Sequence, residues 1–305
     1  FIIINLIYGF MTTIMHISIN AQGIHVQHKT GKLLLPMLSG IWSAGAVLTS
    51  LLSSVVAKHL SLSWHIDGVA GVSFLIAIIG LYGMRRDLLN PREEYDTVPS
   101  ISLKTILNTF KFIPALSFGH ILIVQSEFAA GDWSSIFTHN SIGVSVAAAS
   151  LCYLVFMTTM AFGRIFAHKI NFKYSEAQLI KWVPRFGSIG FGAFLILSTA
   201  LAKEHRSEAF ICALIAYIFL GAGNSFLIPM IFGIAARKSN VMPGMVIASM
   251  GLVGASLSFL VKIVISWVAQ ATNLTVALLI PTVMLFLGST LNRYGSTEPK
   301  AIEAN

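Results

Sequence analysis

Four polar side chains follow one another along an otherwise apolar stretch, and they are the residues of this chain most suited to chemistry. His120, Gln125, Glu127 and Asp132 lie in the run LSFGHILIVQSEFAAGDWSSIF, which covers residues 116–137. A carboxylate inside an apolar segment is costly unless it is paired, protonated or in contact with water. Glu127 and Asp132 are therefore candidates for coupling to a proton or a solute, and His120 and Gln125 for lining the same cavity. Alternatively, the two acids cap an exposed helix end, with Asp132 as an N-cap.

Three more polar residues stand alone inside apolar runs. His16 lies about one helical turn before Asn20. Histidine changes its charge near neutral pH, so His16 is a second coupling candidate and Asn20 a cavity candidate. A histidine that only hydrogen-bonds between helices is the alternative. Lys262, in the run MGLVGASLSFLVKIVISW, either pairs with an anion or extends its amine to the membrane surface.

Two stretches, one around Gly163 and Arg164 and one around Asn224, are typical of helices that change shape. The run MTTMAFGRIFAHK predicts a span that leaves the membrane at Gly163 and Arg164, where the arginine could reach a neighbouring helix end or carboxylate and act as a latch. Ordinary anchoring by a basic residue is the alternative. The small-residue face around Gly40 and Ser43 indicates close helix packing.

The run GAGNSFLIPMIFG predicts a helix interrupted at Gly221, Gly223 and Pro229. Backbone groups freed by such a break are tolerated where they line protein or a water-filled cavity. Asn224 is therefore a cavity candidate, with close helix packing as the alternative.

The composition excludes a water-soluble protein. The 305 residues are 55% hydrophobic and 10% charged, with a mean hydropathy of +0.79, whereas soluble domains carry about 25% charged residues. The net charge of +8 does not indicate nucleic-acid binding, because the basic residues lie in short clusters between apolar runs. The sequence predicts no cofactor and no metal, since His25 and His28 have no acid or cysteine nearby. It predicts no enzyme either, since HExxH, Ser-His and phosphate-loop patterns are absent.

Nine segments are long and apolar enough to cross a bilayer, which takes roughly 20 residues. They are residues 1–18, 34–57, 67–84, 105–127, 144–163, 184–202, 208–235, 244–269 and 274–292. We expect a partial bundle of three helices in residues 1–84, a loop at 85–104, a complete six-helix bundle at 105–292 and a tail at 293–305.

The basic residues fall mainly on one side of these segments. Fifteen lie on the side of the 85–104 loop: Lys29, Lys32, Arg85, Arg86, Arg92, Lys104, Arg164, Lys169, Lys173, Lys181, Arg185, Arg237, Lys238, Arg293 and Lys300. Three lie on the other side: Lys58, Lys203 and Arg206. The positive-inside rule then makes the loop and the carboxyl terminus cytoplasmic.

An odd number of spans puts the two termini on opposite sides of the membrane. A carrier made of two six-helix halves has both termini inside. Three further spans before residue 1 would restore that arrangement, so we expect the chain to begin in the fourth span of a twelve-span protein.

Four stretches resemble the major facilitator superfamily, nearest its fucose-permease-like branch and the bacterial relatives without an assigned substrate. The stretches are INAQGIHVQHKTGKLLLPMLSGIWSAGAV, EFAAGDWSSIF, MTTMAFGRIFAHK and GAGNSFLIPMIFGIAAR. The resemblance implies family helices 4 to 12. It assigns Asn20 to a cavity or a moving element, and Glu127 and Asp132 to the acidic feature of the seventh family helix. It also places Gly163 and Arg164 in the second-half loop motif, and the residues Gly221, Gly223, Asn224 and Pro229 in the tenth family helix.

The function implied by this resemblance is secondary active transport. Such a protein moves a small solute by alternating access around a midplane cavity, coupled to a proton or sodium gradient. The expected location is the bacterial plasma membrane, with the lipid bilayer and the solute as partners. The alternative is a membrane protein that does not transport, such as a sensor, an assembly partner or a truncated inactive carrier.

Overall fold

The computed structural model describes residues 2–30, 34–56, 61–83, 103–239 and 243–298. The predicted loop at 85–104 lies almost wholly outside these ranges. All regular structure within them is helical, which confirms the predicted all-α class. The helices are α1 (Ile2–Thr30), α2 (Leu34–Val56), α3 (Leu62–Gly83), α5 (Leu103–Phe112), α6 (Pro114–Phe137), α7 (Val146–Lys173), α8 (Glu176–Leu201), α9 (Arg206–Asn224), α10 (Leu227–Lys238), α11 (Pro243–Ala271) and α12 (Leu274–Gly288). A π-helix, η1 (Thr138–Ile142), follows α6, and a 3-10 helix, η2 (Ser289–Tyr294), follows α12.

Each of the nine predicted segments contains a helix or a pair of helices. By length and hydropathy alone, six helical stretches of the described chain could cross a membrane: Ile66–Gly83, Val146–Ala167, Glu176–Leu201, Arg206–Lys238, Gly244–Ala271 and Leu274–Tyr294. Helix α6 has 24 residues but is not among them. Its candidate site residues, which are polar, lower its hydropathy below the level of the six candidate spans.

Two predicted boundaries are wrong. The segment predicted at 105–127 is two helices, α5 and α6, separated at Ile113, with Pro114 in the first turn of α6. Proline fits a first turn because the amide hydrogen that it lacks would have no partner there. Helix α6 then runs on to Phe137, so Glu127 and Asp132 are interior helical residues rather than caps. The N-cap of α7 is Ser145, whose side chain accepts from the Ala148 amide.

Helix α7 is also longer than predicted. It continues to Lys173, so the chain does not turn at Gly163 and Arg164. The turn comes at Tyr174 and Ser175, and a capping box starts α8 there: the Ser175 side chain accepts from the Gln178 amide, and the Gln178 side chain accepts from the Ser175 amide. Such reciprocal caps satisfy amides that the helix itself leaves free.

The predicted interruption in residues 221–229 is confirmed as a break between α9 and α10 at Ser225 and Phe226. Pro229 explains its position. In a continuous helix the amide of residue 229 would donate to the carbonyl of Ser225, four residues earlier, but proline has no amide hydrogen. The Ser225 carbonyl is therefore free to accept from another part of the protein.

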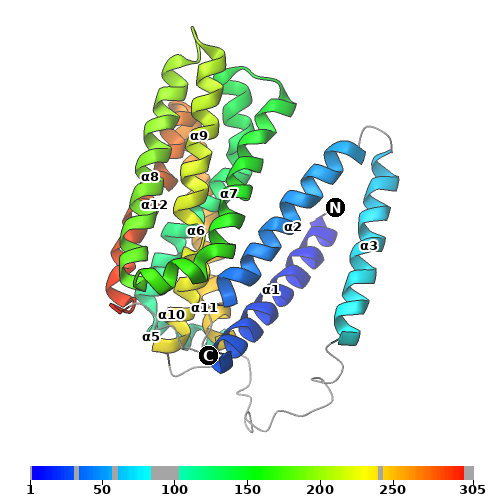
Figure 1. Cartoon of the computed structure of the whole chain (residues 1–305), viewed down its shortest axis with the longest axis vertical. Helices are drawn as coiled ribbons and strands as arrows, with labels where there is room; N and C mark the ends of the chain where they lie inside the picture. The colour runs from blue at the N-terminus through cyan, green and yellow to red at the C-terminus, as the bar shows by residue number, and fades with distance from the viewer. Residues whose placement is uncertain (1, 31–33, 57–60, 84–102, 240–242, 299–305) are drawn as a thin grey trace. The chain divides into compact units, whose positions relative to one another are not determined.

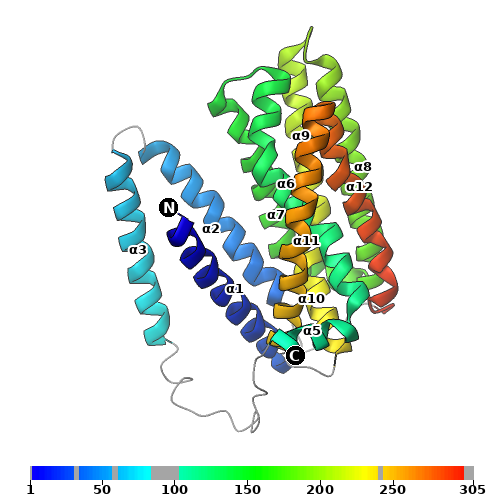
Figure 2. The same ribbon diagram turned by 180° about the vertical axis from the view of Figure 1, so that it is seen from behind.

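Helices α6 to α12 lie side by side, and the two opposite views in Figures 1 and 2 agree on this. Helices α8 and α9 meet where Gly187 faces Gly223, backbone against backbone, with no room for a Cβ atom on either residue. Gly221 lies against the carbonyl of Phe156 on α7. These close approaches are the reason for the glycines, since small residues let transmembrane helices pack tightly.

The chain forms two compact units. The first comprises Phe1–Ala44 and Leu103–Asn305, and the second comprises Gly45–Ser102. In the second unit, every described side chain of α3 between Ile66 and Gly83 is exposed. All the interactions of the candidate site described below lie within the first unit.

Candidate functional site

Arg164 is the centre of the candidate site. Its side chain is only 4% exposed and lies in the interior of α7, nine residues before the helix ends at Lys173. Its Nη2 atom donates to Oε2 of Glu127 on α6 at 3.0 Å. Its Nε atom donates to the Ser225 carbonyl at 2.6 Å, and its Nη1 atom to the Ser43 hydroxyl on α2 at 2.8 Å. One guanidinium thus joins α2, α6, α7 and the break between α9 and α10.

The break supplies one of these contacts directly. Because Pro229 leaves the Ser225 carbonyl without an amide partner, that carbonyl can accept from Arg164. Gly163 brings the two elements together, since a Cβ at this position would lie 2.5 Å from the Ser225 Cβ and Oγ atoms. The predicted reach of Arg164 to a carboxylate and a helix end is therefore confirmed, but from inside the bundle rather than across a turn.

Glu127 is held by two donors. Besides Arg164, the Asn224 side-chain amide donates to its Oε2 atom at 3.4 Å. Glu127 is the 14th of the 24 residues of α6, so it lies roughly 20 Å from one end of the helix and 15 Å from the other. A carboxylate at such depth is expensive without a partner, and here it has a buried cation.

His16 and Asn20 lie on α1, where the Asn20 side-chain amide donates to the His16 carbonyl at 2.8 Å and lies 3.3 Å from the His16 ring. His16 is close enough to Glu127 and Arg164 to interact electrostatically with both. The structure thus brings together four residues that are far apart in the sequence: His16, Glu127, Arg164 and Asn224.

His120 and Gln125 are buried in α6 without hydrogen-bond partners for several polar atoms. The His120 ring packs against Phe232 of α10 in a tilted arrangement, with ring centroids 5.0 Å apart, and it faces Gly254 of α11. Within the described part of the chain, its Nδ1 atom has no partner, and neither polar atom of the Gln125 amide has one. Such atoms cost free energy in an empty protein, which makes them good candidates for binding a solute.

Asp132 and Lys262 form a separate pair. Their charged atoms are 2.6 Å apart, and the two side chains are 43% and 40% exposed. The Lys262 amine also lies 4.9 Å from the centre of the Phe128 ring. Lys262 therefore pairs with an anion, as one of the two interpretations of the sequence expected, but the pair is too exposed to need functional chemistry to explain it.

Sequence reasoning missed two contributors to these contacts. Ser43 was assigned only to a packing face, and Ser225 acts through its backbone, which no side-chain pattern reveals; the proline four residues after Ser225 was the available signal. A third ion pair, in which Arg237 donates two hydrogen bonds to the carboxylate of Glu176, was also missed. In the described residues no three metal-ligating side chains lie close enough together to hold a metal ion.

Comparisons with known proteins find similarity to two transporters. The chain is 22% identical over 272 residues to an uncharacterized MFS-type transporter of Yersinia pestis, covering 89% of this chain and 66% of that protein. It is also 22% identical over 273 residues to the uncharacterized transporter y4wD of Sinorhizobium fredii, covering 88% and 67%. The chain thus spans about two thirds of the length of each relative. No family model matches the chain, and no solved structure matches it. Similarity over nearly nine tenths of the sequence, together with membrane-length helices, supports an all-helical membrane protein similar to the MFS-type transporters.

Proposed function

We propose that the chain acts as a secondary transporter that moves a small solute by alternating access, with Glu127 as the group that couples movement to a proton or sodium gradient. The observation that carries this proposal is the ion pair between the buried Arg164 and Glu127, which is 19% exposed, at a helix break. The pair lies in the interior of α6 and α7, and stability alone does not explain it, because buried ion pairs stabilise proteins little on balance.

The partners of Arg164 supply the two states that such a mechanism needs. When Glu127 binds a proton or a sodium ion, its attraction for Arg164 falls. Arg164 still has the Ser225 carbonyl and the Ser43 hydroxyl as acceptors. Loss of the ion pair would then let α6 move relative to the other helices while the guanidinium keeps two hydrogen-bond acceptors. The break beside Ser225 can absorb such a movement as a hinge.

The polar atoms near this centre support a solute site on α6. Gln125 is 1% exposed and its amide offers both a donor and an acceptor, neither of them used by the described residues. His120 offers a third such atom. A solute with hydroxyl, amide or carboxylate groups would satisfy such atoms, and His120 shares a helical face with Glu127, seven residues later.

A substitution at Gln125 separates a binding role from a structural one. Gln125→Leu is expected to raise the free energy of unfolding by about 1–3 kcal/mol, because it removes two buried polar atoms that lack partners. It should also abolish stabilisation by the solute. The measurement is thermal unfolding of the detergent-purified chain against a panel of sugars, amino acids and organic acids.

The matched control is Ser117→Ala, which removes a buried hydroxyl that also lacks a partner, two turns earlier on α6. This variant should keep the response of the wild type to any stabilising compound. A Gln125→Leu protein that is less stable than the wild type, or that still responds to the compound, would contradict the proposed solute site.

The orientation is also part of the proposal. We place the chain in the bacterial plasma membrane with its carboxyl terminus in the cytoplasm. Moving Arg164 from the predicted turn into the bundle removes one basic residue from the cytoplasmic group, and the strong asymmetry of the other basic residues still supports this orientation.

A further inference from the structure

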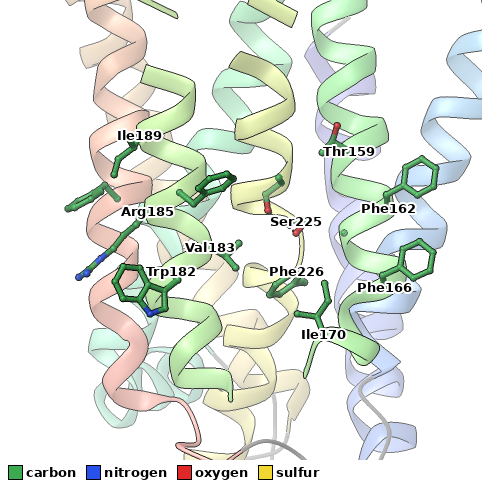
Figure 3. A pocket seen from close by; sticks show the side chains of 14 residues that line it. Thr159, Phe162, Phe166, Ile170, Trp182, Val183, Arg185, Ile189, Ser225 and Phe226 are labelled. Carbon is green, nitrogen blue, oxygen red and sulfur yellow. Dashed lines mark hydrogen bonds between the residues drawn. The ribbon is translucent and has the colours of Figure 1, made fainter. Parts of the chain in front are cut away.

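An apolar groove of about 1020 Å³ lies between α7 and α8, with the break between α9 and α10 at its floor. Figure 3 shows Phe162 and Phe166 of α7 on one side and Trp182 of α8 on the other, with Phe226 between them. These walls face outward: the exposed fraction is 59% for both Phe162 and Trp182 and 64% for Phe186. Both helices are of membrane length, and in a membrane an outward apolar groove between them would face lipid chains.

Basic side chains gather over the aromatic rings at one end of this groove. The Lys169 amine lies 5.5 Å from the centre of the Phe166 ring, and the Lys181 amine 5.0 Å from that of Trp182. The Arg185 guanidinium carbon lies 5.8 Å from the same Trp182 ring. Lys169 is near the end of α7 and the other two are in the first turns of α8, so all three lie toward the short connection between these helices.

These three cations lack a carboxylate partner in the described part of the chain. The ion pairs found there use Arg164, Arg237 and Lys262 instead. Arg185 donates its Nε hydrogen to the Ser289 hydroxyl at 2.9 Å, which leaves the outer nitrogens of its guanidinium for another acceptor. This end of the groove therefore has a surplus of positive charge beside an apolar channel.

We propose that the groove binds an anionic phospholipid, with one acyl chain between α7 and α8 and the phosphate held by Lys169, Lys181 and Arg185. The positions of these basic residues along their helices fit a phospholipid. Lys181 and Arg185 lie roughly 8 and 14 Å along α8 from its first residue, and the long side chains of lysine and arginine can reach upward to the headgroup level. The groove is as large as pockets that hold drug-sized ligands, about 300–1,000 Å³. Charge at one end and an apolar channel at the other match a lipid, whereas a soluble anion would leave the channel unused.

The test compares two lipids with the same acyl chains, phosphatidylglycerol and phosphatidylcholine, added in equal amounts to the detergent-purified full chain. Native mass spectrometry counts the lipid that stays bound. The wild type should retain phosphatidylglycerol preferentially. Each basic residue near a lipid surface contributes about a five-fold gain in binding, so Lys181→Gln with Arg185→Gln should weaken phosphatidylglycerol retention about twenty-five-fold and leave phosphatidylcholine unchanged.

The control is Lys238→Gln, which removes an exposed cation from the end of α10 that does not line the groove. It should preserve the preference, and an excess of inorganic phosphate should not displace the lipid. A second variant, Val183→Trp, fills the channel from the wall of α8 and should reduce retention of both lipids. Equal retention of the two lipids by the wild type, an unchanged preference in the double variant, or displacement by phosphate would overturn the proposal. None of these readouts depends on transport.

Discussion

Replacing Arg164 by methionine is expected to lower the free energy of unfolding by about 3–5 kcal/mol, because the change leaves a carboxylate without its counter-ion inside the protein. Glu127 would keep only the 3.4 Å contact from Asn224. The Ser225 carbonyl and the Ser43 hydroxyl would lose the donor that now joins α2 and the helix break to α7. Unfolding of the detergent-purified chain, followed by intrinsic fluorescence, measures the loss.

The double variant Glu127→Gln with Arg164→Met is the informative control. It removes both charges, so it should be more stable than Arg164→Met alone, since replacing a whole buried pair costs far less than breaking it. Glu127→Gln alone should also cost stability, because it leaves the 4% exposed Arg164 with neutral acceptors only. If the two single effects simply add in the double variant, the pair is not coupled and its central place in the site is wrong.

Arg237→Ala is expected to destabilise the chain by about 2–3 kcal/mol, at the low end for loss of one partner of a buried, hydrogen-bonded charge pair. Glu176 is 3% exposed, and two hydrogen bonds of 2.6 and 2.8 Å join it to Arg237. Its Oε2 atom also accepts from the Ser296 amide, which ties the segment after η2 to the start of α8. Among the described residues, the Ser296 amide is then the one hydrogen-bond donor left to the Glu176 side chain.

Replacing Glu176 instead of Arg237 should lower the free energy of unfolding by less. Arg237 is 38% exposed, so in Glu176→Gln water can solvate the unpaired guanidinium, and a cost of about 1 kcal/mol is expected. Lys238→Ala, next to Arg237 on α10 and exposed, serves as the control and should have no measurable effect. Chemical denaturation of the wild type and these three variants measures the order of their free energies of unfolding. An equal loss for the two pair variants would mean that burial of Glu176 does not set the cost.

Hydrophobic segments and helix breakers made most of the fold predictable. The nine apolar runs all contain helices, and the break at Ser225 follows from a proline whose effect is local and independent of tertiary contacts. Boundaries failed where polar residues lie inside a helix. Glu127, Asp132 and Arg164 resembled the ends of spans because a charge in an apolar run usually marks the membrane surface.

The candidate site was predictable in its members but not in its contacts. Glu127, Asn224 and Arg164 attracted attention because polar residues are rare in such segments. That these residues meet could not be deduced from the sequence. The elements that carry them, α6, α7 and the break between α9 and α10, are 37 to 97 residues apart along the chain. The rotation of each helix about its own axis is set by packing. Glu176 was missed because an acid at the start of a helix is common and indicates no partner.

Solute accumulation in proteoliposomes under an imposed pH or sodium gradient tests most directly whether Glu127 couples transport. The solute is the compound that stabilises the purified chain in the unfolding screen. We predict that Glu127→Gln still binds this compound and equilibrates it across the membrane but no longer accumulates it. Asp132→Asn, which removes the half-exposed acid of the neighbouring pair, should accumulate it as the wild type does. Full accumulation by Glu127→Gln, or its loss in Asp132→Asn alone, would contradict the assignment of coupling to the buried ion pair.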